Sequence, residues 1–392
     1  MTYFVGIDIA KFKHDCFIMN EYGVVIRNSF SFSNNSSGFN ELLNTLNSLN
    51  SQDIRIGFEA TAHYGVNLKL FLESNNFSFM EFNPLLVERF SKTSSLRKTK
   101  TDKKDASLIA FYLSSVKYQP YQYKSYQIYS LKSLTRSRDK LIKQRSIYLV
   151  KITNCLDLIF PEFKSFFGDS LKSASAMYLL HNYPSPKKIA NMNVDSYHKM
   201  IDKLHNHKFS YAKFLKLKEL AKNTVGFSND ILEFQLSSFL ELYKQTDSQI
   251  NHYERKISQI MNEFNFKTST IPGIGVISAA SIVSEFGGDF SRFSNPNKML
   301  AFAGLEPSTI QSGTMLTKGK MVKHGSGYLR ETLMNVAMTC IVQCPKFYDY
   351  YLKKRSEGKP HRVALSHLCR KLIRIIHHLE TTNSNFSFEK LN

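Results

Sequence analysis

The pattern of apolar residues in the first hundred or so positions constrains the fold more than any other feature. From Phe4 to about Phe32, three runs of strand-like residues are joined by short turns, which predicts three antiparallel strands. SGFNELLNTLNSLN then has helical spacing with Ser37 as its cap, IRIGFEA reads as a buried strand, VNLKLFLESN as a helix and FSFMEF as another strand. A further helix begins near Asp102. This order predicts a mixed α/β sheet flanked by helices.

Two long amphipathic segments occupy the middle of the chain, at about 126–160 and 231–264. Their apolar residues recur near helical spacing with charged residues between them. The insert that separates them is helical in pattern, and its stretch 165–225 matches nothing specific. Because neither long segment keeps a strict heptad for more than about three repeats, the pattern fits a coiled-coil arm and an ordinary helical bundle equally.

The last third of the chain contains two glycine-rich features. In STIPGIGVISAASIVSEFG, Gly273 and Gly275 precede a helix of small residues, and such glycines let backbone amides approach a phosphate closely. We interpret this as a helix-hairpin-helix clamp on the DNA backbone, with a plain tight turn as the alternative. Further on we expect a glycine-rich basic loop leading into a helix, and then a basic helical end that faces nucleic acid. The basic residues of the loop and of the helix start are Lys318, Lys320, Lys323 and Arg330.

The charge of the chain indicates a polyanionic partner. Lysine and arginine total 52 against 32 acids, a net charge of +20. A soluble chain with such an excess most often binds nucleic acid. The alternative is that the charge only keeps the protein in solution, although the excess is well above the ~2–8 typical of a small domain.

Composition also suggests a cellular compartment. No apolar run approaches the ~18–20 residues of a membrane span, and MTYFVGIDIAK lacks the basic start and apolar core of an export signal. The 5 cysteines are scattered and form no CxxC pair, so we expect reduced core residues. We therefore expect no membrane contact and a location in the cytoplasm.

Two acidic residues lie inside predicted strands. In FVGIDIA the apolar side chains share one face of the strand and Asp8 takes the other, and Glu59 closes IRIGFEA in the same manner. An ionised carboxylate in a buried strand costs several kcal/mol unless a cation pairs with it. The small neighbours Gly6 and Ala10 leave room for such a cation beside Asp8.

The stretch LRKTKTDKKDASLIAFYL, residues 96–113, adds two acids at the start of an apolar helix. Asp102 and Asp105 are three residues apart and share a helix face. With Asp8 and Glu59 they complete a set that suits Mg²⁺ or Mn²⁺, and a pair of such ions can assist phosphoryl transfer. Alternatively, Asp102 and Asp105 only cap the helix and complement its dipole, which leaves Asp8 unexplained. Lysines around this pair would hold the phosphates of a substrate. They are Lys98, Lys100, Lys103 and Lys104.

Several motifs together resemble one known family. GIDIAK, GFEATAHYG and KTDKKDA resemble the RuvC-like, RNase-H-fold amino-terminal domain of DEDD transposases of the Piv/MooV insertion-sequence family. IPGIG, FAGLEP, QSG and HGSGYLR resemble the carboxy-terminal transposase domain of that family. The resemblance implies a RuvC-like α/β domain at 1–122, a helical or coiled-coil region at 123–264, and a mostly helical domain at 265–392. That last domain would carry the helix-hairpin-helix element and a serine loop.

The resemblance also implies a function. Family members cut and rejoin DNA to move an insertion element, and an element-encoded bridge RNA selects donor and target DNA. Carried over to this chain, Asp8, Glu59, Asp102 and Asp105 coordinate Mg²⁺ or Mn²⁺ and are catalytic. Ser312, in GLEPSTIQSG, becomes the nucleophile that bonds covalently to DNA, and the chain acts as a homo-oligomer, a dimer or tetramer. Judged from the residues alone, an ordinary turn serine is the alternative reading of Ser312.

Two other function classes compete with a serine recombinase. A metal-dependent RuvC-like nuclease or Holliday-junction resolvase would use the same four acids to activate water. A non-enzymatic nucleic-acid binder would have kept the fold and lost the chemistry, but the presence of all four acids argues against it.

Overall fold

A computed structural model describes residues 1–49, 53–60, 63–94, 102–120, 125–168, 171–205, 209–227, 229–312, 315–321 and 325–388. Within these ranges, the backbone alone is described at residues 85, 93–94, 102–104, 125, 307–312, 315–321. The chain divides into two compact units, Met1–Lys132 with Phe266–Asn392, and Ser133–Asn265, and each is described by itself.

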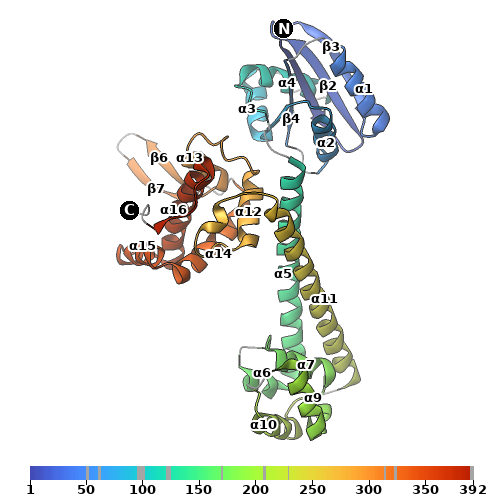
Figure 1. Cartoon of the computed structure of the whole chain (residues 1–392), viewed down its shortest axis with the longest axis vertical. Coiled ribbons are helices and arrows are strands. Elements are labelled where there is room, and N and C mark those ends of the chain that lie inside the picture. Colours follow the sequence, from blue (N-terminus) through green and yellow to red (C-terminus); the bar gives the residue numbers. More distant parts are fainter. Residues whose placement is uncertain are drawn as a thin grey trace. The chain divides into compact units, whose positions relative to one another are not determined.

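The amino-terminal part of the first unit is built on a mixed sheet with the strand order β3-β2-β1-β4-β5 (Figure 1). The strands are β1 (Tyr3–Ile9), β2 (Lys13–Asn20), β3 (Val25–Ser33), β4 (Ile54–Glu59) and β5 (Phe79–Phe82). β1, β2 and β3 pair antiparallel, and β4 and β5 extend the sheet in parallel with β1. The predicted three-stranded meander and the two later strands are confirmed.

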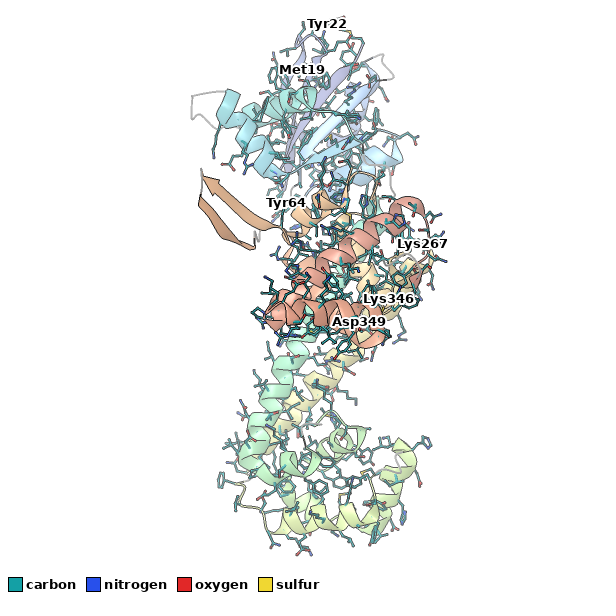
Figure 2. All side chains as sticks on the ribbon, turned by 90° about the vertical axis from the view of Figure 1, so that its left-hand side faces the viewer. Met19, Tyr22, Tyr64, Lys267, Lys346 and Asp349 are labelled. Carbon is teal, nitrogen blue, oxygen red and sulfur yellow. The ribbon has the colours of Figure 1, made fainter. Side chains whose placement is uncertain are left out.

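Helices cover both faces of this sheet. α1 (Ser36–Asn47) and α2 (Val66–Ser74) pack on one face, and α4 (Asp102–Ser115) packs on the other. On the first face, strand residues such as Val5 and Ile7 form a core with Leu42 and Leu72. On the second, Phe4 and Met19 share a core with residues of α4, and Figure 2 labels Met19. An additional helix that the sequence analysis did not predict, α3 (Pro84–Ser94), follows β5 directly.

The start of α1 differs from the prediction by two residues. Asn35, not Ser37, is the cap, because its side-chain oxygen accepts a hydrogen bond of 3.0 Å from the backbone amide of Gly38. The Ser37 hydroxyl lies inside the first turn and donates to the same oxygen of Asn35 at 2.8 Å. Both residues are good caps, and the sequence alone does not separate them.

The second unit contains most of a pair of long helices, α5 (Ser125–Ile159) and α11 (Asp230–Asn262), as predicted. Arg138 of α5 binds Glu254 of α11 at 2.6 Å, and Arg145 binds Asp247. A step of seven residues forward along α5 is thus a step of seven residues back along α11, so the helices run antiparallel. A coiled-coil seam between them stays a prediction.

The insert between these two helices is a helical bundle with a core of its own. Its helices are α6 (Pro161–Phe167), α7 (Ala174–Asn182), α8 (Pro186–Ala190), α9 (Val194–Leu204) and α10 (Tyr211–Lys222). They pack on the carboxy-terminal end of α5 and the amino-terminal end of α11, through residues such as Phe163, Phe214 and Leu236.

The carboxy-terminal part of the first unit is mostly helical. Its elements are η1 (Thr268–Thr270), α12 (Val276–Phe286), α13 (Pro296–Ala303), β6 (Pro307–Ser312), β7 (Met315–Met321), α14 (Gly327–Gln343), α15 (Pro345–Ser356) and α16 (His361–Thr382). Part of the predicted basic loop is instead the antiparallel hairpin of β6 and β7. Gly, Ser, Thr and Lys are common in loops, so composition does not reveal backbone pairing of this kind.

The structure also bears on the expected state of the cysteines and on the expected lack of membrane-spanning helices. The five cysteines are buried and unpaired, as expected for core residues. In the ranges that the structure describes, we find no helix with the length and apolar character needed to cross a membrane.

A glycine-to-alanine change at Gly6 tests the packing of α4 on the sheet. A Cβ atom at Gly6 would lie 2.2 Å from the carbonyl oxygen of Ala106 and 2.5 Å from the amide nitrogen of Ala110. Both are backbone atoms, so relief requires moving α4. We expect Gly6→Ala to lower the free energy of unfolding by about 1–3 kcal/mol or more, measured by chemical denaturation.

Gly327→Ala is the matched control. A Cβ atom there would meet only the end of the Arg330 side chain, at 3.9 Å. Its stability should stay within about 0.5 kcal/mol of the wild type. Equal stabilities of the two variants would contradict the close packing of α4 on β1.

Candidate active site

The alternation of side chains in β1 places Asp8 on the face of the sheet that α4 covers. Val5, Ile7 and Ile9 belong to the core under α1 and α2, whereas Phe4 belongs to the core under α4. Because successive side chains of a strand point to opposite faces, Asp8 lies on the α4 face.

Glu59 lies beside Asp8 on the same face. In β4, Ile56 and Phe58 point into the core under α1 and α2. β1 and β4 are parallel with Ile7 opposite Phe58, so the next residue of each strand is an acid at the same level. Neighbouring strands lie about 4.7–4.9 Å apart. The sheet thus brings together two carboxylates that are far apart in the sequence.

The direction of α4 brings its first turn to this same edge of the sheet. Tyr118, just after α4, donates or accepts a 3.0 Å hydrogen bond with the Ser78 hydroxyl, and its ring lies 5.6 Å from the guanidinium of Arg55. Arg55 is near the start of β4, so α4 ends where the parallel strands begin. Its amino-terminal turn, with Asp102 and Asp105, therefore lies toward the strand ends that carry Asp8 and Glu59.

The donor set fits a hard divalent cation in its chemistry. Carboxylate oxygens are the ligands that Mg²⁺ and Mn²⁺ prefer. Among residues whose side chains the structure describes, no three acids, histidines or cysteines are grouped closely enough to hold a metal ion. The Asp102 side chain is outside that description, as are those of Lys103 and Lys104, and Lys98 and Lys100 lie wholly outside the described residues.

The backbone places Ser312 at the closed end of the hairpin. Ser312 is the last residue of β6 and pairs with Met315, the first residue of β7. Lys318 and Lys320 belong to β7, so the structure corrects their assignment to a loop. Lys323 lies outside the described residues.

Two of the motifs that carry the resemblance hold the base of this hairpin. A Cβ atom at Gly325 would lie 2.3 Å from the carbonyl oxygen of Phe302, which explains glycine at this position. Arg330 donates to the carbonyl oxygen of Ala303 at 3.1 Å. Residues of FAGLEP at the end of α13 and residues of HGSGYLR after β7 thus pack against each other. Arg330, predicted to bind nucleic acid, makes at least this contact within the protein.

Glu285, which the sequence analysis did not single out, fixes the same region. The residue is 2% exposed, and its carboxylate accepts a 2.8 Å hydrogen bond from the Ser326 hydroxyl. The same hydroxyl caps α14, because it accepts a hydrogen bond from the amide of Leu329 at 3.2 Å. The Lys132 ammonium lies 3.8 Å from Glu285. In the sequence, the signal for this role was a single glutamate within a helix made mostly of small and apolar residues.

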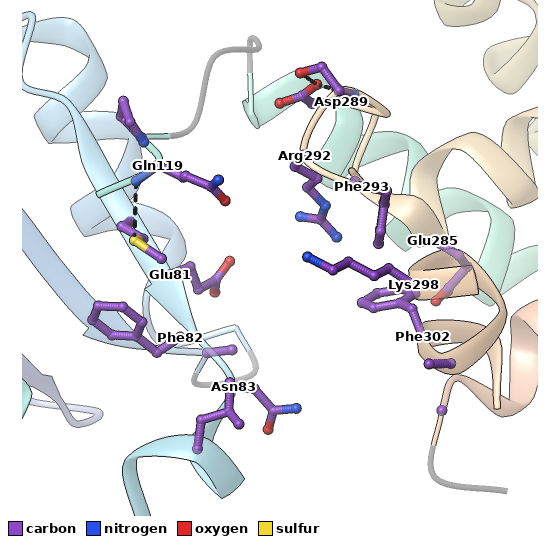
Figure 3. Close-up of a pocket in the computed structure, with 18 of the residues that line it drawn as sticks. Glu81, Phe82, Asn83, Gln119, Glu285, Asp289, Arg292, Phe293, Lys298 and Phe302 are labelled. Atoms are coloured by element: carbon purple, nitrogen blue, oxygen red, sulfur yellow. Dashed lines mark hydrogen bonds between the residues drawn. The ribbon is translucent and has the colours of Figure 1, made fainter. Parts of the chain in front are cut away.

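A cluster of aromatic and basic residues lies on α13 and the segment before it. The guanidinium of Arg292 lies 4.8 Å from the ring centre of Phe293 and 5.4 Å from that of Phe302 (Figure 3). Phe302 is 38% exposed, and the Lys298 side chain is also exposed. Cations held against aromatic rings are suited to phosphates and unpaired bases. The sequence signal was the mixture of Phe, Arg and Lys in FSRFSNPNKMLAF.

The two glycines of IPGIG have different surroundings. Gly273 has a φ of +93°, and a Cβ atom there would lie 2.7 Å from the Cα atom of Cys340 in α14. Its lack of a side chain is therefore required by packing within the protein. Gly275 has open space around it and precedes α12 without a side-chain cap. Of the pair, Gly275 is the one whose surroundings leave its backbone open to a phosphate.

Comparison with known proteins agrees with these features. A family model described as "Transposase" matches residues 5–161, and one described as "Transposase IS116/IS110/IS902 family" matches residues 267–352. The chain is 22% identical to the mini-circle putative transposase for IS117 of Streptomyces coelicolor, over 100% of this chain and 96% of the relative. It is 23% identical to the pilin gene-inverting protein of Moraxella lacunata, over 98% of this chain and 97% of the relative.

A shorter stretch has higher identity. An uncharacterized 43.6 kDa protein of insertion element IS110, also from Streptomyces coelicolor, is 31% identical over 108 residues, 28% of this chain and 26% of the relative. The two family models match the segments that carry the paired acids and the serine hairpin, in the order expected. The chain belongs to the IS110/IS116/IS902 family of insertion-sequence transposases, enzymes that recombine DNA.

Proposed function

We propose that this transposase cuts and rejoins DNA by metal-assisted phosphoryl transfer with Ser312 as the nucleophile. The observation that carries the proposal is that Asp8 and Glu59 lie side by side at the carboxyl ends of β1 and β4. The first turn of α4 lies toward these strand ends. We assign the domain around this edge to the RNase-H-like, RuvC-like fold that the family implies.

Four acids of this domain would hold Mg²⁺ or Mn²⁺. Asp8 and Glu59 extend from neighbouring strands, and Asp102 and Asp105 come from the first turn of α4. When bound, the ions would stabilise negative charge on the reacting oxygens. The lysines at positions 98, 100, 103 and 104 would hold the DNA backbone through its phosphates.

Ser312 would attack a phosphodiester of DNA. Its oxygen forms a bond to phosphorus while a bond from phosphorus to a DNA oxygen breaks; the serine gives up its proton, and the released DNA oxygen takes one up. Attack by a hydroxyl of the other DNA end reverses these changes and frees the serine. One phosphodiester bond is replaced by another at each step, so rejoining needs no ATP.

The remaining basic surface would bind the rest of the nucleic acid. We propose donor and target DNA as substrates, a structured bridge RNA as guide, and a dimer or tetramer as the working form. Lys318, Lys320, Lys323 and Arg330 would contact phosphates near Ser312, and Gly273 and Gly275 would form part of a helix-hairpin-helix clamp. Because the substrate is chromosomal DNA, we place the protein in the cytoplasm, at the nucleoid.

The antiparallel helices α5 and α11 would act as an arm. Their ion pairs hold a fixed register, and the bundle at one end has an independent core. We propose that α5 and α11 contact each other as a coiled coil. The arm that they form would also allow protomers to associate.

A nuclease or Holliday-junction resolvase is the alternative. The acid site lies wholly in the amino-terminal domain, so it could activate water without any contribution from the serine hairpin. The two functions differ in whether DNA becomes covalently attached to the protein.

Removal of the Ser312 hydroxyl separates the two functions. We expect wild-type protein and Ser308→Ala, a control on the same strand, to form a covalent adduct with end-labelled DNA that survives denaturing electrophoresis. Ser312→Ala should form none, and strand transfer should fall by at least about 10³-fold, because the nucleophile is absent. Undiminished cleavage by Ser312→Ala would favour the nuclease.

Loss of a single metal ligand should stop both cutting and rejoining. Asp8→Asn keeps the shape of the side chain and removes its charge, so we expect DNA cleavage to fall at least about 10²-fold at saturating Mg²⁺. Excess chelator should do the same to the wild type, with recovery on adding Mn²⁺. Strand transfer at the normal rate in chelator would refute the metal site.

Binding of DNA and RNA should weaken steeply with salt. Contacts to phosphates release counterions, so the logarithm of affinity should fall linearly with that of the salt concentration, by about 0.9 for each duplex phosphate contacted. Filter binding or fluorescence anisotropy between 50 and 200 mM salt measures this slope. A flat response would rule out phosphate contacts as the main source of affinity.

A further inference from the structure

A third acid lies in register with Asp8 across the sheet. In the antiparallel pair of β1 and β2, Asp15 is directly opposite Asp8. In the next pair, Ser31 of β3 is directly opposite Asp15. Residues directly opposite each other point to the same face, with Cβ atoms about 4.5–5.5 Å apart. Asp15 therefore belongs to the same polar row as Asp8.

The neighbours of Asp15 in β2 confirm which face this is. Phe17 and Met19 belong to the core beneath α4, whereas Cys16 and Ile18 belong to the opposite core. Asp15 alternates with Cys16, so it points to the α4 face. This is the face on which Asp8 and Glu59 lie.

Asp15 is a buried charge with modest compensation. Its exposed fraction is 2%. The Ser31 hydroxyl donates a hydrogen bond to its Oδ1 at 2.5 Å, and the Lys13 ammonium lies 3.6 Å from its Oδ2. The Lys13 side chain is 52% exposed, and ion pairs with such a solvated partner contribute only about 0–1 kcal/mol.

These contacts do not require a carboxylate. An amide oxygen would accept the Ser31 hydrogen bond equally well, and it would remove the repulsion that like charges directly opposite each other produce. Burial of a carboxylate is costly, and repulsion from an acid directly opposite it adds to that cost. A cation at Asp8 reverses this balance, because the negative charge of Asp15 then attracts it.

We propose that Asp15 is a positioning residue of the metal site: its buried charge, fixed by Ser31, strengthens the binding of a divalent cation by Asp8 and Glu59. Asp15 acts through Asp8 and through the field at the ion, and is not itself one of the ligands. The inference rests on the proposed metal site.

The experiment compares cation binding by the full chain and its Asp15→Asn variant. Mn²⁺ is titrated by calorimetry, and the unfolding midpoint is measured in chelator and in saturating Mn²⁺. Residues that support metal ligands typically alter affinity 10–100-fold, so we expect Asp15→Asn to raise the Kd for Mn²⁺ by about tenfold or more. Its midpoint in chelator should equal or exceed that of the wild type, because a buried repulsion is removed.

Two further variants control for structure and for folding. Ser31→Ala removes the hydrogen bond but keeps the charge, so its Kd should change less than that of Asp15→Asn. Lys13→Gln removes a cation at the exposed side of Asp15, so Mn²⁺ should bind about two- to fivefold more tightly. This change has the opposite sign and remains informative if Asp15→Asn fails to fold.

Specific outcomes overturn the proposal. Asp15 would be a structural residue only if Asp15→Asn had a lower unfolding midpoint in chelator and an unchanged Kd for Mn²⁺. If Asp15→Asn cannot be purified, an unchanged Kd for Mn²⁺ in Lys13→Gln would lead to the same conclusion. Asp8→Asn distinguishes the two levels of inference. If the wild type binds Mn²⁺ no better than Asp8→Asn, the metal site itself is wrong and the role of Asp15 falls with it. If Asp8→Asn alone loses binding, only the inference on Asp15 fails.

Discussion

The close approach of α4 to β1 is the contact on which the proposed active site depends. Gly6 has no side chain, so the backbone of α4 at Ala106 and Ala110 can rest directly on the strand. Any larger residue would lift the helix and with it the acids of its first turn. A distance set by backbone atoms is stiffer than one set by side chains, because no rotamer change can absorb a shift. The proposed site requires this rigidity, because carboxylates from separate elements would have to meet one cation.

The sequence predicted the strands and the acids at their ends, but not how the acids pair across the sheet. The alternation in FVGIDIA was sufficient to place Asp8 opposite an apolar core, since the period of a strand is fixed. The position of Asp15 opposite Asp8 depends on the register between two strands, which a turn of one residue more or less would change. Register between the strands of a hairpin is therefore where sequence reasoning stopped, and that is why Asp15 was missed.

The carboxy-terminal motifs illustrate a second limit of sequence reasoning. FAGLEP and HGSGYLR mark the family, yet Gly325, Ser326 and Arg330 make contacts that hold the two ends of the hairpin together. Motif residues thus serve the scaffold as well as the chemistry, and a list of motif positions cannot separate these roles. The sequence analysis interpreted the hairpin as a loop because its amino-acid composition is typical of loops. Composition alone does not show that β6 and β7 pair with each other.

The same electrostatic problem appears at two scales in this protein. The chain carries a net charge of +20, which favours a polyanion, yet its proposed centre is a group of acids that would repel that polyanion. Divalent cations resolve the conflict only if the acids bind them firmly, since a bare acidic site would reject the scissile phosphate. The role proposed for Asp15, a buried extra carboxylate beside Asp8, would make the site more dependent on its ions. DNA and metal would then bind cooperatively, because each supplies the charge that the other needs.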